Sequence, residues 1–191
     1  QITTTNTIMT TKLAPRFIGY VKGSKEAPIV IEAFVDCLCP FSVKLVNNLL
    51  PIVDKKQDKL QLRLVHYIQP WHAQATYCAY NVAYAYLTKG DEAAVNAFTA
   101  IANNIEKFSD SALADKTVNH IKKEIADVTG VTEDPDLQQK ADRLIKNTQK
   151  YGRQQSIHIT PTISINGLVE SEPSSSWNEQ QWLNFLNPIC Q

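Results

Sequence analysis

The feature that most constrains this chain is the run Ile29–Val35, which is almost entirely apolar and rich in β-branched side chains. Such a run is typical of a strand that is buried on both faces inside a sheet. Pro40 follows soon after, and proline is well suited to the first turn of a helix. Apolar residues then recur with helical spacing from residue 42 to 56, where Pro51 is expected to introduce a kink. The sequence therefore predicts a buried strand that leads directly into a helix.

Four more segments have strand character: Phe17–Val21, Leu60–Val65, Thr162–Ile165 and Leu168-Val169. The last two flank Asn166-Gly167, which is the strongest short signal for a β-hairpin because both residues tolerate positive φ. The sequence thus predicts strands on both sides of the central helix and a hairpin near the C-terminus.

Between these strands the pattern changes to alanine-rich and charged segments with a period near 3.6 residues. They predict four helices, over residues 72–88, 91–106, 111–128 and 135–153. A last helix is expected near the C-terminus, capped by Ser176 and burying Trp177 and Trp182.

Composition sets limits on function. Lys+Arg and Asp+Glu both number 19, so the formal net charge is zero, and neither nucleic acid nor an anionic membrane is expected as a partner. No apolar run approaches the ~20 residues that span a bilayer, so a soluble chain is expected. The sequence begins at Gln1, which fits either a removed leader peptide or a trimmed boundary. The oligomeric state stays open.

Two motifs resemble a known family. Residues 23–42 read GSKEAPIVIEAFVDCLCPFS, which is similar to the pattern G-S-x-x-A-P-V-x-I-V-E-F-x-D-x-x-C-P-F-C of DsbA-like thiol–disulfide oxidoreductases. Residues 159–167 read ITPTISING and resemble the G-T-P-T-x-x-x-N-G segment of the same family. Trp71–Ala75, at the start of the helical block, is similar as well. The resemblance covers residues 17–187.

This resemblance implies an α/β, thioredoxin-like fold with an inserted helical subdomain, as in DsbA-like proteins. The predicted division is an N-terminal arm over residues 1–16, a thioredoxin-like domain made of residues 17–70 and 157–191, and an inserted helical subdomain over residues 71–156. The predicted order of strands and helices agrees with this arrangement.

The resemblance also implies the site residues. Cys39 is the expected nucleophile, at a helix N-terminus where free N–H groups and the helix dipole stabilise a thiolate. Pro161 aligns with the cis-proline of the fold, which lies beside the reactive cysteine. The backbone of Thr160 would then pair with an extended substrate. Pro40, Thr160 and Pro161 are therefore the expected substrate-binding residues.

Two positions depart from the family pattern. Ser42 stands where the second, resolving cysteine belongs, and a serine cannot release a mixed disulfide. Ala33 stands where the family has a buried glutamate. Glu32 is adjacent, but a shift of one residue along a strand points a side chain to the opposite face. Both departures indicate altered or lost oxidoreductase activity.

The pairing of the four cysteines is open, because four cysteines allow three connectivities. Cys37 is a candidate second catalytic residue that would resolve a mixed disulfide at Cys39, although a disulfide within C-x-C closes a strained ring. The favoured interpretation is a structural disulfide between Cys37 and either Cys190 or Cys78. Taken alone, Cys78 is expected to be a small buried packing residue.

No metal site and no cofactor are expected, because no two of the four histidines have the short spacing of a zinc site. His158 either faces Cys39 or is an ordinary loop histidine, and the second interpretation is preferred. His72 is expected to cap or pack at the start of the helical block.

Two functions follow from these observations. The first is a secreted or luminal, atypical thiol–disulfide oxidoreductase or isomerase-like protein that uses Cys39 on polypeptide thiols and disulfides. Reduced glutathione or Cys37 would resolve its mixed disulfides. The second is a redox-inactive thioredoxin-fold protein that binds a polypeptide or ligand, or serves a structural role. A Cys39→Ser substitution separates them, because only the first function depends on the thiol.

Overall fold

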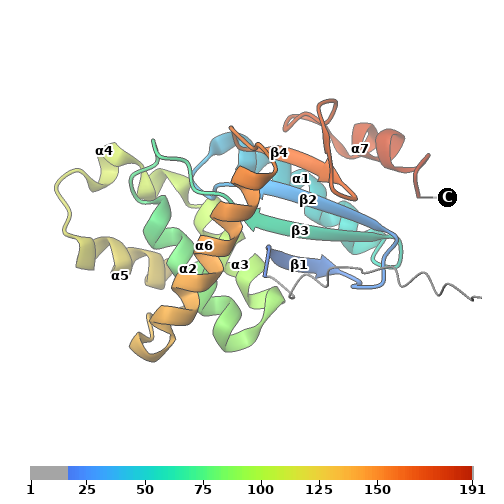
Figure 1. The fold of residues 1–191 in the computed structure, drawn as a ribbon. Helices are drawn as coiled ribbons and strands as arrows, with labels where there is room; N and C mark the ends of the chain where they lie inside the picture. Colours follow the sequence, from blue (N-terminus) through green and yellow to red (C-terminus); the bar gives the residue numbers. More distant parts are fainter. Residues whose placement is uncertain (1–16, 191) are drawn as a thin grey trace, which may run out of the picture.

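The computed structural model describes residues 17–190 and has a five-stranded sheet at its centre (Figure 1). The spatial order is β1-β3-β2-β4-β5. β2 and β3 run parallel, and every other neighbouring pair is antiparallel. The predicted arm, residues 1–16, lies outside the described residues. The strands are β1 (Tyr20–Gly23), β2 (Ile29–Val35), β3 (Leu60–His66), β4 (Thr162–Ile165) and β5 (Leu168–Glu170).

Helix α1 connects β2 to β3, and the block α2–α6 connects β3 to β4. Figure 1 shows α6 crossing in front of the strands, with α1 behind them. None of the helices in residues 17–190 is both long and apolar enough to cross a membrane. The α-helices are α1 (Pro40–Lys55), α2 (Ala75–Lys89), α3 (Asp91–Ala102), α4 (Asp110–Leu113), α5 (Val118–Thr129), α6 (Gln138–Gln154) and α7 (Glu179–Leu186), with 3₁₀ turns at Ile105–Phe108 and Pro135–Leu137.

This arrangement confirms the predicted α/β fold with helices inserted between two strands of one sheet. Strand β2 has the predicted bounds, and every residue from Ile31 to Val35 is buried. The hairpin also forms as predicted, since Asn166 and Gly167 both adopt positive φ, of 48° and 86°. The division into a domain and a subdomain at residues 70 and 157 stays a prediction.

The predicted helix over residues 111–128 is wrong, because this segment contains two helices. Helix α4 ends at Leu113, and α5 begins only at Val118. The side chain of Thr117 accepts a hydrogen bond from the backbone N–H of His120 and so caps a new helix. A side-chain cap of this kind stabilises a helix start, and here it does so within a continuous periodic pattern.

Two further boundaries differ from the predictions. Strand β1 begins at Tyr20, and Phe17 instead packs its ring against that of Tyr20 at 5.1 Å. The last helix is capped by Asn178 rather than Ser176, in a reciprocal capping box with Gln181. In both cases the element begins a few residues later than predicted: the strand at Tyr20 rather than Phe17, and the helix cap at Asn178 rather than Ser176.

Glu32 lies on the face of β2 that α6 covers, opposite to Ala33, as predicted. Its carboxylate is buried and pairs with the guanidinium of Arg63 at 2.9 Å. It also accepts hydrogen bonds of 2.8 Å from the hydroxyls of Tyr151 and Ser164. Burial and the hydrogen bond to Glu32 raise the pKa of Tyr151 to about 12, so this hydroxyl remains a donor at neutral pH. The network ties α6 to the sheet.

We expect Glu32→Gln to lower the free energy of unfolding by roughly 1–3 kcal/mol, because Arg63 loses its counter-charge and a strong hydrogen-bond acceptor. Urea denaturation followed by circular dichroism measures this change. Glu26→Gln is the matched control, since Glu26 is exposed, and it should change stability by less than about 0.5 kcal/mol. Equal effects of the two substitutions would show that the buried network does not contribute to stability.

Candidate active site

Cys39 lies where the loop after β2 enters α1. It is the N-cap residue, with extended backbone angles (φ −88°, ψ 117°), and Pro40 opens the helix. Its carbonyl accepts a hydrogen bond from the N–H of Val43 at 3.0 Å. The side chain is 6% exposed and makes no capping hydrogen bond to the helix. The predicted position of Cys39 at a helix N-terminus is therefore confirmed, but its thiol does not cap the helix.

The thiol of Cys39 contacts the loop that precedes β4. Its Sγ donates a hydrogen bond of 3.3 Å to the carbonyl of Thr160, although the two residues are 121 positions apart. The peptide bond between Thr160 and Pro161 is cis, as the family resemblance implied. Thr160 is buried, Pro161 is half-buried and Pro40 is exposed. The structure thus brings together Cys39 and the three residues predicted to bind substrate.

Ser42 is fully buried on the first turn of α1. Its hydroxyl oxygen accepts a hydrogen bond of 3.3 Å from the backbone N–H of Asp36. Ser42 therefore stabilises the loop in front of the helix, at the position where the family has its second cysteine.

The carboxylate of Asp36 holds this loop in place. Oδ1 accepts a hydrogen bond from the N–H of Leu38 at 2.9 Å, and Oδ2 accepts one from the N–H of Gln69 at 2.8 Å. Nδ1 of His72 lies 3.0 Å from the same Oδ2. Asp36 is fully buried. Asp36 is a site residue that was not predicted from the sequence, although an acidic residue directly after a buried strand is a recognisable signal.

Cys37 points into the core, where its thiol lies close to that of Cys78 on α2. Burial, the contact with Cys78 and the nearby charge of Asp36 raise the pKa of Cys37 well above its usual value. A protonated thiol is a poor nucleophile. Cys78 is itself completely buried, as predicted.

The predicted disulfide between Cys37 and Cys190 is wrong. All four cysteines lie within residues 17–190, and all are free thiols. Cys190 lies close enough to Lys56 for the two to interact electrostatically, and Lys56 directly follows the C-terminal end of α1. Cys37 precedes the opposite end of this helix, which has 16 residues and is therefore ~24 Å long. A disulfide needs Cα atoms within about 7 Å, so Cys37 and Cys190 are too far apart to form one. The alternative partner, Cys78, does contact Cys37, but as a thiol.

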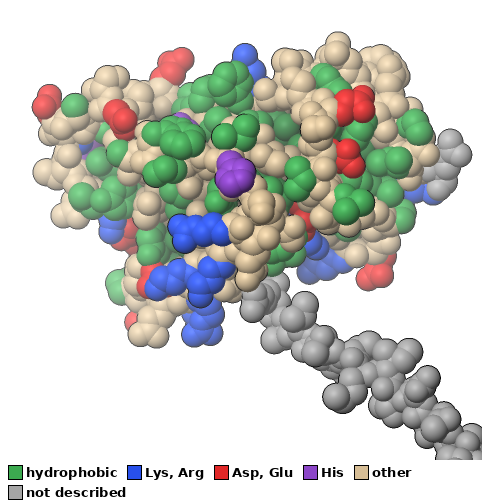
Figure 2. All heavy atoms as spheres, turned by 45° about the horizontal axis from the view of Figure 1, so that its top comes forward, with side chains coloured by type: hydrophobic (Ala, Val, Ile, Leu, Met, Phe, Trp, Pro, Cys, Tyr) green, Lys and Arg blue, Asp and Glu red, His purple; other side chains and the backbone are tan. Residues whose placement is uncertain are grey.

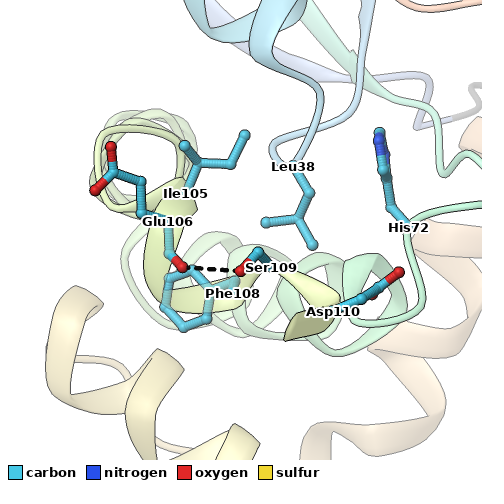
Figure 3. Close-up of a pocket in the computed structure, with 7 residues that line it drawn as sticks. All are labelled: Leu38, His72, Ile105, Glu106, Phe108, Ser109 and Asp110. Carbon is cyan, nitrogen blue, oxygen red and sulfur yellow. Dashed lines mark hydrogen bonds between the residues drawn. The ribbon is translucent and has the colours of Figure 1, made fainter. Parts of the chain in front are cut away.

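A mostly apolar pocket of about 330 Å³ adjoins the loop between the two cysteines (Figure 3). Leu38 projects into this pocket from one side, and His72 borders it. The other lining residues come from the segment between α3 and α4, where Ser109 donates a hydrogen bond to the carbonyl of Glu106. The pocket offers an apolar contact beside the loop of Cys39.

Large apolar side chains are exposed close in sequence to the site residues. Phe41 is 58% exposed, Trp71 59% and Ile159 62%. Figure 2 shows a face of the molecule on which hydrophobic side chains gather around a histidine. His158 is exposed and lines a separate hollow with Trp71 and Arg153, which agrees with an ordinary loop histidine.

Comparison with known proteins decides the family. A sequence profile of the family described as thioredoxin matches residues 18–184. The chain belongs to the thioredoxin family. Comparison with curated proteins gave no significant match.

Solved structures agree with this assignment. A candidate protein-disulfide isomerase from Pseudomonas syringae superposes with a TM-score of 0.78 at 29% identity, covering 88% of this chain and 97% of its own. A periplasmic thioredoxin-like protein from Salmonella enterica serovar Typhimurium gives 0.66 at 15% identity, covering 91% and 90%. The thiol–disulfide exchange protein α-DsbA2 from Wolbachia pipientis gives 0.62 at 14% identity, covering 90% and 87%. This thioredoxin-family chain therefore has a DsbA-like fold.

We expect Ser42→Ala to lower the free energy of unfolding by about 1–3 kcal/mol, because the buried N–H of Asp36 loses its acceptor. Chemical denaturation measures the change. Ser171→Ala is the control, since Ser171 is exposed and its substitution should be nearly neutral. A neutral Ser42→Ala variant would contradict the structural role of this hydroxyl.

Proposed function

We propose that this thioredoxin-family protein carries out thiol–disulfide exchange through a single cysteine, Cys39. The observation that carries the proposal is the hydrogen bond from Cys39 to the carbonyl of Thr160, next to the cis peptide bond of Pro161. It places the thiol beside backbone groups of a loop that an extended polypeptide can pair with. The fold shared with thiol–disulfide exchange proteins supports the same function.

The exchange step follows from the chemistry of the thiolate. The Cys39 thiolate attacks one sulfur of a substrate disulfide, so that a mixed disulfide forms and the other substrate sulfur leaves as a thiolate. Ser42 has no sulfur with which to release the mixed disulfide. Cys37 is completely buried and its pKa is raised, so it is not available either. Release therefore requires an external thiolate.

Two thiolates can supply that release, and they lead to different outcomes. If a second thiol of the same substrate attacks, the substrate exchanges one internal disulfide for another, which is isomerisation. If reduced glutathione attacks, the substrate leaves as a mixed disulfide with glutathione and Cys39 is regenerated. In both cases the number of disulfides is conserved.

The substrate class that we propose is a polypeptide in an extended or partly unfolded state. Phe41, Trp71 and Ile159 expose apolar area close in sequence to the site residues, and such area favours contact with the apolar side chains that unfolded chains expose. Disulfides persist in oxidising compartments, so the proposed location is the secretory lumen or the extracellular space.

The second candidate function is binding of a polypeptide without redox turnover. The specific observations that favour it are the serine at position 42 and the alanine at position 33. It would use the same apolar surface, but it does not require the thiol of Cys39.

We expect Cys39→Ala to reduce exchange activity to the uncatalysed rate, because no other thiol reaches the substrate. The assay is isomerisation of a scrambled disulfide protein in a glutathione buffer. Cys190→Ala is the control and should retain full activity, since Cys190 lies beyond α7. Full activity of Cys39→Ala would sink the exchange proposal, and a wild type that binds unfolded polypeptide without turnover would favour the second candidate.

We expect Ser42→Cys to convert the site from one that accumulates mixed disulfides into one that releases them, because the new thiol is placed to attack Cys39. Each protein is incubated with a disulfide-linked peptide without added thiol, and its intact mass is measured. The wild type should gain the mass of one peptide half, whereas the variant should lose two hydrogens and carry no peptide. Absence of any adduct on the wild type would contradict the proposal.

A further inference from the structure

Behind the active-site loop, the ends of neighbouring strands bring three metal-binding side chains together. Asp36 and Cys37 directly follow β2, and His66 is the last residue of β3. The two strands are parallel, with Val35 opposite His66. One ligand atom from each of Asp36, Cys37 and His66 lies within 4.8 Å of the other two, and all three residues are buried. A carboxylate, a thiol and an imidazole are therefore clustered inside the protein.

The imidazole of His66 has no partner that accounts for its nitrogens. The residue is only 2% exposed, and neither Nδ1 nor Nε2 has a hydrogen-bond partner among residues 17–190. Phe98 packs edge-on against the ring, with centroids 5.4 Å apart, but this apolar contact provides no hydrogen bond to either nitrogen. Leaving a buried nitrogen without a partner is unfavourable, so a missing ligand is a direct explanation.

Two more features complete a set of four donors. The thiol of Cys78 lies close to that of Cys37 in the same core cluster. The Asp36 carboxylate has about four lone-pair sites, and only three are used, by Leu38, Gln69 and His72. Hydrogen-bonded carboxylates of this kind are typical of metal ligands, because their partners fix the orientation of the oxygen.

We propose that Asp36, Cys37, His66 and Cys78 hold a structural zinc ion beneath the active-site loop. Zinc takes sulfur, nitrogen and oxygen ligands in a tetrahedron at ~2.0–2.3 Å, which puts the ligand atoms about 3.4–3.8 Å apart. The ligand atoms of Asp36, Cys37 and His66, which lie within 4.8 Å of one another, then need only a small contraction. The thiol of Cys78, which lies outside this group of three, has to move closer to complete the tetrahedron. Calcium and magnesium are disfavoured, because they require oxygen ligands. Each thiol gives up its proton to solvent as the ion binds.

A disulfide between Cys37 and Cys78 is the rival use of the two thiols. It would leave both nitrogens of His66 unpartnered, and it would not explain why Asp36 and His66 converge on Cys37. The zinc ion gives a partner to one nitrogen of His66 and to the other three groups at once. The proposal is independent of the exchange chemistry, since the thiol of Cys39 is directed to Thr160 and stays outside the cluster.

The first test uses the full chain as purified. Zinc is measured by mass spectrometry of the elements, and we expect about one ion per chain, as for a closed site with four protein ligands. The zinc is then removed and replaced by cobalt, whose thiolate-to-metal absorption appears only when cysteine sulfur binds the ion. A folded protein that takes up neither zinc nor cobalt, or that binds cobalt without thiolate absorption, overturns the proposal.

The second test uses matched variants. Cys37→Ala, Cys78→Ala and His66→Leu should each lower zinc retention by about tenfold or more, whereas Cys39→Ala, Cys190→Ala and His158→Ala should retain it. If a ligand variant fails to fold, the cobalt spectrum of the wild type still shows whether cysteine sulfur binds the metal. Full retention in Cys37→Ala or His66→Leu would overturn the site. So would a native Cys37–Cys78 disulfide, mapped by alkylation without reductant in metal-free protein as purified.

Discussion

Three groups from two separate loops converge on the carboxylate of Asp36, which is fully buried where β2 ends. The N–H of Leu38 belongs to the loop that carries Cys39, and the N–H of Gln69 and the ring of His72 belong to the loop after β3. A buried carboxylate is tolerated only when it is hydrogen-bonded, so burial of Asp36 holds the two loops against each other. The position of the loop that carries the Cys39 thiol therefore depends on Asp36.

From this loop the two cysteines diverge. The thiol of Cys39 is directed to the Thr160 loop, where it donates a hydrogen bond to the carbonyl of Thr160. Cys37 faces inward, where it meets Cys78, Asp36 and His66. Only one residue separates Cys37 from Cys39. In an extended backbone, residues i and i+2 point to the same side. The turn held by Asp36 breaks that pattern, so the two thiols serve different surroundings.

The replacement of the resolving cysteine by Ser42 fits this separation. The hydroxyl of Ser42 accepts the N–H of Asp36, so the residue contributes to the loop rather than to redox chemistry. Glu32, one position away from the expected buried carboxylate, is likewise committed to Arg63 and Tyr151 on the other face of the sheet. Ser42 and Glu32 thus both have structural roles in this protein.

The sequence by itself determined the strands, the hairpin, most of the helices and the position of Cys39 at a helix N-terminus, since these follow from periodicity, turn residues and motifs read over short stretches. It also placed Pro161 beside Cys39, through the family resemblance. Only the tertiary structure decided the partners of Cys37, the isolation of Cys190 and the clustering of His66 with Asp36. Those contacts join residues that are far apart in the chain. Local sequence patterns do not show which buried polar groups come into contact once the strands and helices pack.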